Sequence, residues 1–352
     1  MEKDLKSKTV AQLERLVTGL GQPRYLAGYI FSAIQARGVT DISAITTLSK
    51  SFRAKLVEEG CYISKLEIVD KLTDPDGTAK YVFGLSDGSR IESVLLFDDD
   101  RRTLCVSTQV GCAMGCVFCA TGRLGLARNL TAGEIVDQVN LVEIDTRSSI
   151  LERASSIANR VSNVVFMGMG EPLANYEAVL DAVRILNNSA GRHIGIRHLT
   201  MSTCGLVEGI ERLADEDIGP RLAISLNAPT DAIRQKLMPI TKKYPLNRLF
   251  AAIERYQRTT RNRVTFEYCL IKGVNDTVLH AQMLVKRLRG VMCNVNLIEY
   301  NSHEGCSLKP SGRQAIERFA GVLKDAGIET TIRLKMGQTI NAACGQLGAR
   351  TK

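Results

Sequence analysis

The chain contains no tryptophan, and aromatic residues make up only 5% of its 352 residues. Proteins that bind single-stranded nucleic acid without sequence preference stack successive bases on exposed aromatic rings. The scarcity of aromatics therefore argues against a broad base-stacking platform in this protein.

Long apolar segments are missing as well. No run reaches the length of a membrane-spanning helix, and the N-terminus lacks the apolar region of a secretory signal peptide. The ten cysteines are not spaced like a secreted disulfide framework, and in a chain of this length they fit a reducing compartment better. We therefore expect a soluble, cytoplasmic protein that does not associate with membranes.

The sequence has no excess of acidic residues. Lys and Arg number 46 against 37 Asp and Glu, which gives a formal net charge of +9. A basic balance favours a polyanionic partner, most commonly nucleic acid. The arginines between Arg255 and Arg263 and the pair Lys242-Lys243 are candidate phosphate contacts, with a solvated face as the favoured alternative for the arginines.

Residues 1–60 have apolar side chains at helical spacing in three segments, around 13–20, 25–38 and 43–59. This pattern predicts a small helical domain, and the residues leave open whether it only packs against the rest or also grips RNA. Residues 61–100 alternate as strands do, with turn sequences at 74–77 and 86–88, which predicts a small antiparallel β-hairpin extension. Glu92 lies in its last strand, where a glutamate usually faces solvent.

From residue 101 to 335, strands and amphipathic helices alternate. The expected strands are 103–108, 163–167, 198–202, 221–226, 264–271 and 293–299, with helices following at 131–141, 175–188, 206–216, 246–260 and 276–289. Such alternation requires a parallel sheet with right-handed crossovers. Because a closed eight-unit barrel needs roughly 250 residues, six units predict a partial, open (β/α)6 barrel of TIM-like type. Its wide mouth would admit a large substrate.

Three further features complete this α/β architecture. The pair Thr131 and Glu134 reads as a capping box that opens the first of these helices. The stretch 145–163 looks like a surface linker. A last helix at 311–325 and a strand at 329–334 lead into a C-terminal tail, 336–352, which is rich in small residues.

Three cysteines stand at C-x3-C-x2-C spacing within eight residues: Cys112, Cys116 and Cys119. Four thiolates hold a typical iron–sulfur cluster, so three ligands would leave one iron open to a substrate. A zinc site is the alternative, but zinc ligands usually come in two pairs, and no second pair follows Cys119 at the required spacing. Glycines flank the cysteines and allow the backbone to wrap tightly around an inorganic core, at Gly111, Gly115 and Gly122.

In parallel β/α architectures, function gathers at the C-terminal ends of the strands. The second strand ends in Gly168-Met169-Gly170-Glu171-Pro172, where glycines permit close backbone approach and Glu171 could receive an ammonium group. Hydroxyls and amides that suit ribose, carboxylate or adenine follow three other strands, at Ser202, at Ser225-Leu226-Asn227 and at Asn301. A capped turn is enough to explain each of these segments alone. It explains less well why all of them occur together on one rim of the barrel.

Two other cysteines need an explanation. Cys105 lies in the strand that feeds the cysteine loop, and Cys344 lies in the small-residue tail, which can reach a pocket as chain termini often do. The remaining cysteines are interpreted as core filling: Cys61, Cys204, Cys269, Cys293 and Cys306.

The C-x3-C-x2-C motif, with Phe118 just before its third cysteine, resembles that of the radical S-adenosylmethionine (SAM) enzymes. Over nearly the whole chain the sequence is similar to the RlmN family of adenosine-C2 methyltransferases, which act on 23S rRNA and tRNA. The segments that carry this resemblance are 105–112, 168–172, 225–229, 237–240, 273–276 and 342–347. Asn227 departs from the family, which commonly has His there. The related Cfr family methylates carbon 8 of the same rRNA adenosine, and Pro172 resembles RlmN more than Cfr.

The resemblance implies one [4Fe–4S] cluster on Cys112, Cys116 and Cys119, with SAM bound to the open iron. Contacts to SAM would come from Gly170, Glu171, Ser202, Ser225, Leu226, Asn227 and Asn301. An electron donor such as flavodoxin or ferredoxin would reduce the cluster, and the enzyme would act as a monomer.

The resemblance also implies two SAM molecules per turnover. The first methylates Cys344, and the second gives a radical that activates this methyl group for addition to carbon 2 of an adenosine in the peptidyl transferase centre or a tRNA anticodon loop. Glu92 would accept the proton from carbon 2. Cys105 would release the methylated RNA by forming a transient disulfide with Cys344, so we expect Cys105 to be accessible and partly ionised. A carbon-8 methyltransferase and a non-catalytic, metal-containing RNA-binding protein remain the alternatives.

Overall fold

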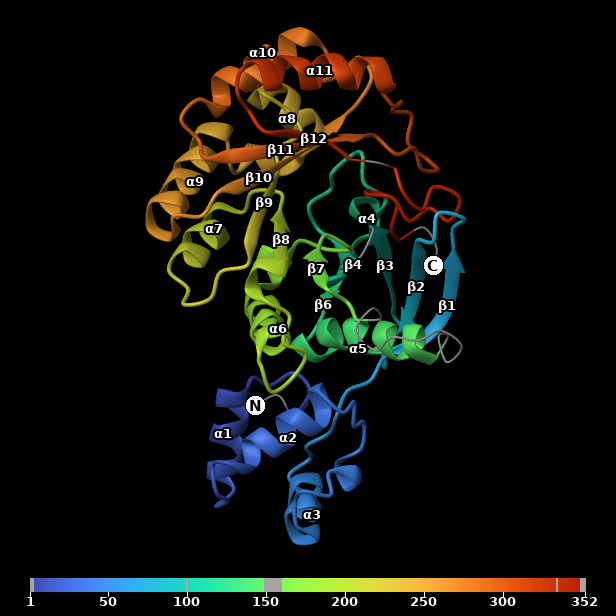
Figure 1. The fold of residues 1–352 in the computed structure, drawn as a ribbon, viewed down its shortest axis with the longest axis vertical. Helices are drawn as coiled ribbons and strands as arrows, with labels where there is room; N and C mark the ends of the chain where they lie inside the picture. The colour runs from blue at the N-terminus through green and yellow to red at the C-terminus, as the bar shows by residue number, and fades with distance from the viewer. Residues whose placement is uncertain (1–2, 99–100, 149–159, 334, 349–352) are drawn as a thin grey trace.

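The computed structural model describes residues 3–98, 101–148, 160–333 and 335–348 (Figure 1). Three helices form the predicted small domain at one end of the molecule: α1 (Val10–Gly19), α2 (Leu26–Gln35) and α3 (Lys50–Glu58). The third helix is shorter than expected because the Ser49 hydroxyl accepts a hydrogen bond from the Phe52 amide and caps the first turn there. The residues before it form a separate 3-10 turn, η1 (Ile42–Ala44).

The strands of the remainder form one ten-stranded sheet in the order β1-β2-β3-β4-β7-β8-β9-β10-β11-β12. Pairing is antiparallel from β1 to β4 and parallel from β4 to β12. The strands are β1 (Glu67–Thr73), β2 (Ala79–Gly84), β3 (Arg90–Asp98), β4 (Arg101–Cys105), β7 (Asn163–Phe166), β8 (Leu199–Thr203), β9 (Arg221–Ser225), β10 (Val264–Leu270), β11 (Cys293–Glu299) and β12 (Thr330–Ile332). Among the described residues the sheet begins at β1 and ends at β12, so the predicted open, partial barrel is confirmed.

Two features of the sheet differ from expectation. The antiparallel extension is continuous with the barrel, because β3 pairs with β4 along its edge. The strand that precedes the tail, β12, pairs parallel to β11 and lengthens the parallel part beyond the six predicted strands.

The helices after the cysteine loop follow the predicted order. They are α5 (Ala132–Ser148), α6 (Tyr176–Asn187), α7 (Val207–Ala214), α9 (Leu246–Thr260), α10 (Val278–Leu288) and α11 (Arg313–Asp325). The capping box of α5 is confirmed, since the Thr131 amide donates to Glu134 Oε2 at 2.9 Å and the Glu134 amide donates to Thr131 Oγ1 at 3.1 Å. Because α5 continues to Ser148, the predicted linker begins later than expected, and residues 149–159 lie outside the described ranges.

Short elements were not predicted, because a few residues show no reliable periodicity. A two-stranded sheet of β5 (Gln109–Cys112) and β6 (Gly125–Asn129) frames the cysteine loop together with α4 (Ala120–Arg123). Helix α8 (Asp231–Leu237) follows β9. Within the ranges that the structure describes, no helix is both long and apolar enough to cross a membrane.

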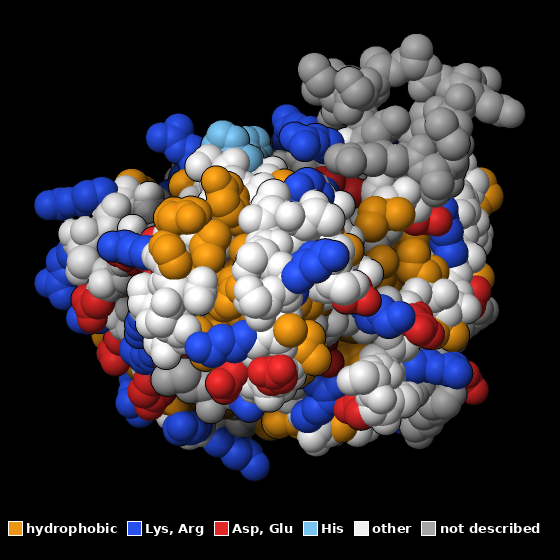
Figure 2. Space-filling model, turned by 90° about the horizontal axis from the view of Figure 1, so that it is seen from below, with side chains coloured by type: hydrophobic (Ala, Val, Ile, Leu, Met, Phe, Trp, Pro, Cys, Tyr) orange, Lys and Arg blue, Asp and Glu red, His pale blue; other side chains and the backbone are white. Residues whose placement is uncertain are grey.

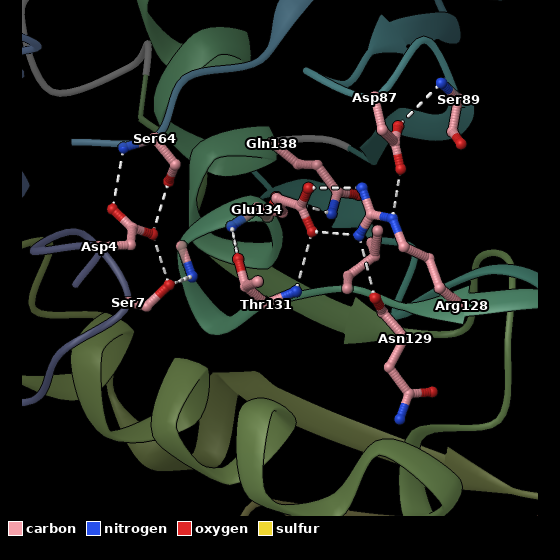
Figure 3. Close-up of polar contacts among 12 residues, drawn as sticks. Asp4, Ser7, Ser64, Asp87, Ser89, Arg128, Asn129, Thr131, Glu134 and Gln138 are labelled. Atoms are coloured by element: carbon pink, nitrogen blue, oxygen red, sulfur yellow. Dashed lines mark hydrogen bonds and ion pairs between the residues drawn. The ribbon is translucent and has the colours of Figure 1, made fainter. Parts of the chain in front are cut away.

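A buried polar network fastens the N-terminal segment to the start of α5 (Figure 3). The Asp4 carboxylate accepts hydrogen bonds from the Ser7 hydroxyl at 2.6 Å and from the amide and hydroxyl of Ser64 at 2.8 and 2.7 Å. The Ser7 hydroxyl in turn accepts from the Gly133 amide at 2.9 Å, and the buried Lys6 ammonium pairs with Asp137 at 2.6 Å. The helical domain is therefore held to the barrel by charged, desolvated contacts.

Replacing Asp4 with Ala should destabilise the fold, because several buried donors would lose their acceptor. We expect the free energy of unfolding to fall by about 2–4 kcal/mol, measured by urea denaturation, with earlier proteolysis of residues 1–60. Glu14→Ala is the control, because it removes only an exposed ion pair with Arg24, and such pairs contribute little. Equal stability of the two variants would contradict this account of Asp4.

Candidate active site at the barrel mouth

The cysteine loop is wrapped as tightly as its glycines suggest. Cys112 ends β5 and Cys119 precedes α4. Gly111 has φ of 77°, and a Cβ at this position would lie 1.9 Å from the Gly125 carbonyl oxygen. A Cβ on Gly122 would come within 3.0 Å of the Cys116 amide nitrogen. The loop backbone therefore has room for glycine only at these two points.

The three thiols lie close enough to act on one another electrostatically. Burial raises the pKa of Cys112 to about 11, with smaller contributions from Glu171 and Cys119. Burial also raises the pKa of Cys116, and the neighbouring thiols Cys119 and Cys112 add to this. A group of desolvated thiols becomes a set of thiolates only when a cation binds there.

This donor set fits an iron–sulfur cluster better than a single ion. Among the described residues, no three His, Cys, Asp or Glu side chains converge as ligands of one metal ion do. A single zinc ion requires all its sulfurs about 2.3 Å from one point, whereas a four-iron cluster needs its thiolates farther apart. Three thiols supplied by one enclosing loop suit a cluster with three protein ligands.

The Gly168–Glu171 turn lies beside the cysteine loop. The Gly168 amide donates to the Val106 carbonyl at 3.0 Å, and a Cβ on Gly170 would lie 2.7 Å from Gln109 Cβ. Glu171 is buried, and its two oxygens accept from the Leu173 amide at 3.1 Å and the Cys204 amide at 2.7 Å. Burial raises the pKa of Glu171, while the Cys204 amide opposes the shift. The side chains of Thr203 and Cys204 also bond to the Glu171 carboxylate, so an ammonium group would share an acceptor that protein donors already engage.

The other predicted contact residues lie at strand ends on the same rim. Ser202 and Ser225 are half-buried at the ends of β8 and β9, and Leu226 is buried. Asn227 has a φ of 58°, a conformation that Asn tolerates better than most residues. Its Oδ1 accepts from the Cys269 amide at 2.8 Å, so its side chain shapes the rim.

The C-terminal tail folds back over this mouth, between α4 and the ends of β2 and β3 (Figure 1). The Asn301 side-chain amide donates to the Cys344 carbonyl at 3.2 Å. The Gly345 carbonyl accepts from the Ala120 amide at 2.7 Å, and the Leu347 carbonyl accepts from the Thr121 hydroxyl at 2.7 Å. These contacts place Cys344 directly beside the cysteine loop. Asn301, expected to bind SAM, here positions the tail.

Cys344 and Cys105 are brought together from distant parts of the chain. Cys105 is half-buried at the end of β4, and Cys344 is exposed at the mouth. Burial raises the pKa of Cys105, and the nearby Cys344 raises it further. The expectation of a partly ionised Cys105 is therefore wrong for this state of the protein. Desolvation by the surrounding protein raises the pKa of Cys344 to about 11, and the negative charge of Glu267 contributes to this shift.

Glu92 does not face solvent, as a glutamate in such a strand usually does. It is fully buried, and its Oε1 lies 3.6 Å from the ammonium of Lys80, which is also fully buried. Its Oε2 accepts from the Gly348 amide at 2.7 Å. The tail and the barrel extension enclose this carboxylate, and the alternating pattern of the strand could not reveal that.

The sequence patterns did not identify several residues that lie at the site. Lys80 and Arg234 are both fully buried. Lys80 stands in an otherwise apolar strand, 79–83, a signal that could have marked it, whereas Arg234 lies in a polar stretch that gave none. The Arg234 guanidinium donates to the carbonyls of Cys204, Ser225 and Leu226 at 2.5, 3.2 and 3.1 Å. Two cysteines interpreted as core filling also lie near the site, since Cys204 interacts electrostatically with Cys116, and Cys269 with Cys344 and Cys119.

Three of the four arginines between 255 and 263 form ion pairs within the protein. The pairs are Arg255 with Asp215 at 2.8 Å, Arg258 with Glu254 at 3.9 Å and Arg263 with Glu329 at 2.8 Å. The charges of these three are thus largely balanced locally, which for them favours the solvated-face interpretation over phosphate contacts.

Comparison with known proteins agrees with this site. A profile described as "Radical SAM superfamily" matches residues 106–281. The chain is 45% identical to a probable dual-specificity RNA methyltransferase RlmN of Alkaliphilus oremlandii, over 99% of this chain and 98% of that protein. It is 44% identical to the dual-specificity RNA methyltransferase RlmN of Syntrophobacter fumaroxidans, over 98% of both. The crystal structure of a radical SAM methyltransferase from Sphaerobacter thermophilus matches with a TM-score of 0.90 and 43% identity over the full length of both chains.

Replacing Cys112, Cys116 or Cys119 with Ala should abolish iron binding, because two remaining thiolates cannot hold the cluster. After anaerobic reconstitution we expect loss of the broad visible absorbance together with SAM cleavage. Cys293→Ala is the matched control, a half-buried cysteine at the start of β11, and should retain its iron. Full iron content in any of the three loop variants would contradict the assignment.

Proposed function

The chain belongs to the RlmN family of radical SAM RNA methyltransferases, and from this premise we propose that it methylates carbon 2 of an adenosine in 23S rRNA and in tRNA. The observation that carries the proposal is the position of Cys344. The tail holds this thiol at the barrel mouth, beside both Cys105 and the cysteine loop. An ordinary methyltransferase has no use for such a pair.

The chemistry of carbon 2 explains why this arrangement is needed. Carbon 2 of adenine is an electron-poor amidine carbon without a nucleophilic lone pair, so direct displacement on a methyl donor cannot occur there. A [4Fe–4S] cluster with SAM, held by Cys112, Cys116 and Cys119, supplies the radical chemistry. Gly170, Glu171, Ser202, Ser225, Leu226 and Asn227 would surround SAM at the strand ends, with Asn301 at the edge of this pocket. One SAM would supply the methyl group and a second the radical in each turnover.

In this mechanism Cys344 carries the methyl group, and one hydrogen atom of this group would pass to the radical derived from the second SAM. The remaining methylene carbon joins carbon 2 to give a covalent enzyme–RNA adduct, whose unpaired electron would return to the cluster. Glu92 accepts the proton that carbon 2 loses. The Cys105 sulfur then attacks the Cys344 sulfur. The sulfur–carbon bond to the RNA breaks, the departing carbon takes a proton to become the methyl group, and a disulfide remains. An external thiol reductant returns the disulfide to two thiols.

The N-terminal helical domain is proposed to grip the RNA. Tyr25 and Tyr29 on α2 are exposed and lie edge to face, with ring centroids 5.8 Å apart. Seen from this end of the molecule, hydrophobic patches lie among interspersed basic and acidic side chains (Figure 2). Two rings can stack on splayed-out bases of a folded RNA, which is how single-stranded loops are commonly recognised.

We further propose that the protein acts as a monomer in the cytoplasm and takes electrons from flavodoxin or ferredoxin. The open rim of the barrel leaves room for an RNA loop, and the net charge of +9 favours an RNA partner.

The two cysteines should differ in the step at which their loss stops the reaction. Cys344→Ala should lack both the methyl mark on the enzyme and the methylated product. Cys105→Ala should instead accumulate RNA that is covalently attached through Cys344, because no thiol remains to attack that sulfur. The measurement is mass spectrometry of the purified variants, with a search for RNA that resists denaturant.

Cys269→Ala is the matched control, since this thiol also adjoins Cys344 and should be dispensable. Normal turnover of Cys105→Ala without an adduct would overturn the role of Cys105. An adduct in Cys269→Ala would transfer that role to Cys269.

Nucleoside analysis of RNA from cells that lack and then regain the gene tests the proposed function as a whole. We expect 2-methyladenosine in 23S rRNA and tRNA to disappear and return. Appearance of 8-methyladenosine would indicate Cfr-like chemistry. Unchanged modification, with RNA binding retained, would indicate a non-catalytic RNA-binding protein.

A further inference from the structure

Two buried charges lie beneath the C-terminal tail. Lys80 on β2 and Glu92 on β3 are both fully buried, and Lys80 Nζ lies 3.6 Å from Glu92 Oε1. The register of the two strands pairs Val82 with Glu92 and Lys80 with Val94, so the charged side chains are diagonal neighbours on one face. The sheet therefore fixes the ion pair independently of the tail.

Each charge binds a different end of the segment that carries Cys344. The Lys80 ammonium donates to the Asn341 carbonyl at 3.3 Å. The Gly348 amide donates to Glu92 Oε2 at 2.7 Å. Both ends of residues 341–348, which we term the Cys344 loop, thus bond to one ion pair, while Asn301 and α4 hold its middle.

The backbone at both ends of the loop has a positive φ. Asn341 has φ of 52° and Gly348 has φ of 99°. A Cβ on Gly348 would lie 2.7 Å from Leu124 Cδ1. Each end of the loop therefore adopts a left-handed backbone conformation at the point where it bonds to the ion pair.

We propose that Lys80 is a positioning residue of the methyl-transfer reaction, which holds the Cys344 loop closed by binding Asn341 and by fixing the carboxylate that binds Gly348. The inference rests on the proposed roles of Cys344 and Glu92. Removing one partner of a buried ion pair leaves an uncompensated charge, which is far more disruptive than losing an exposed pair. Lys80 therefore acts on Cys344 without contacting the RNA.

A consequence concerns the order of steps. Hydrogen bonds to an ionised acceptor are roughly twice as strong as those between neutral groups. When Glu92 accepts the proton from carbon 2, its charge disappears, and both the ion pair and the bond from Gly348 weaken. The C-terminal end of the loop is then freed after the adduct has formed, when Cys105 has to reach the Cys344 sulfur.

The test is hydrogen–deuterium exchange of residues 341–348 in the reconstituted holoenzyme without RNA. Lys80→Met removes the ammonium, and Glu92→Gln keeps an acceptor for Gly348 but removes the charge. We expect exchange at the Gly348 amide to rise about tenfold or more in each variant, as the loss of a charged hydrogen bond implies. Lys6→Met is the matched control, because it breaks an equally buried Lys–Asp pair that contacts α5, and should leave the loop unchanged.

The double variant Lys80→Met/Glu92→Gln separates positioning from general destabilisation. If one ion pair closes the loop, the double variant should exchange about as fast as either single variant, since contacts that act together are not additive. Unchanged exchange in both single variants, or a rise equal to that of Lys6→Met, would overturn the proposal. Because no RNA is present, this result is independent of whether carbon 2 is the site of methylation, which the nucleoside analysis decides.

Discussion

The functional arrangement of this molecule depends on the closure of the tail over the rim of an open parallel sheet. A parallel sheet brings the C-terminal ends of all its strands to one edge, which gathers the cysteine loop, the Gly168–Glu171 turn and Cys105. In the proposed reaction, the tail brings Cys344 to this rim. Its contacts come from α4, from the loop after β11 and from the antiparallel extension. The extension is thus part of the proposed site, to which it brings Glu92 and Lys80.

The environment of the barrel mouth favours the neutral forms of its titratable side chains. Cys112, Cys116, Cys105 and Glu171 all have pKa values raised chiefly by burial. Buried groups of this kind charge only when a specific partner compensates them. The side chains that would hold the cluster and SAM are therefore neutral, or bonded to other protein atoms, before these cofactors bind.

Sequence patterns predicted the parts of the fold that rest on periodic burial. The strands at 264–271 and 293–299 and the helix at 246–260 agree with the structure to within a residue, because each has a continuous buried face. The hairpin β5–β6 and helix α8 were missed because they are too short for periodicity and are shaped by the cysteine loop and the rim. At the site, motif spacing identified the cysteines, whereas Lys80 and the burial of Glu92 depend on the diagonal pairing of β2 and β3. The register between these two strands cannot be predicted from the pattern of either strand alone.

The same contacts bear on the second thiol in the proposed reaction. Burial is the chief cause of the raised pKa of Cys105, and a thiolate at Cys344 would raise it further. Once Cys344 carries a methyl group, its sulfur is a neutral thioether, so this second contribution is already absent when the RNA arrives. Burial then remains as the obstacle to ionisation, and the thiolate rather than the thiol is the attacking species. The position that makes the disulfide possible thus also keeps Cys105 protonated while the tail is closed.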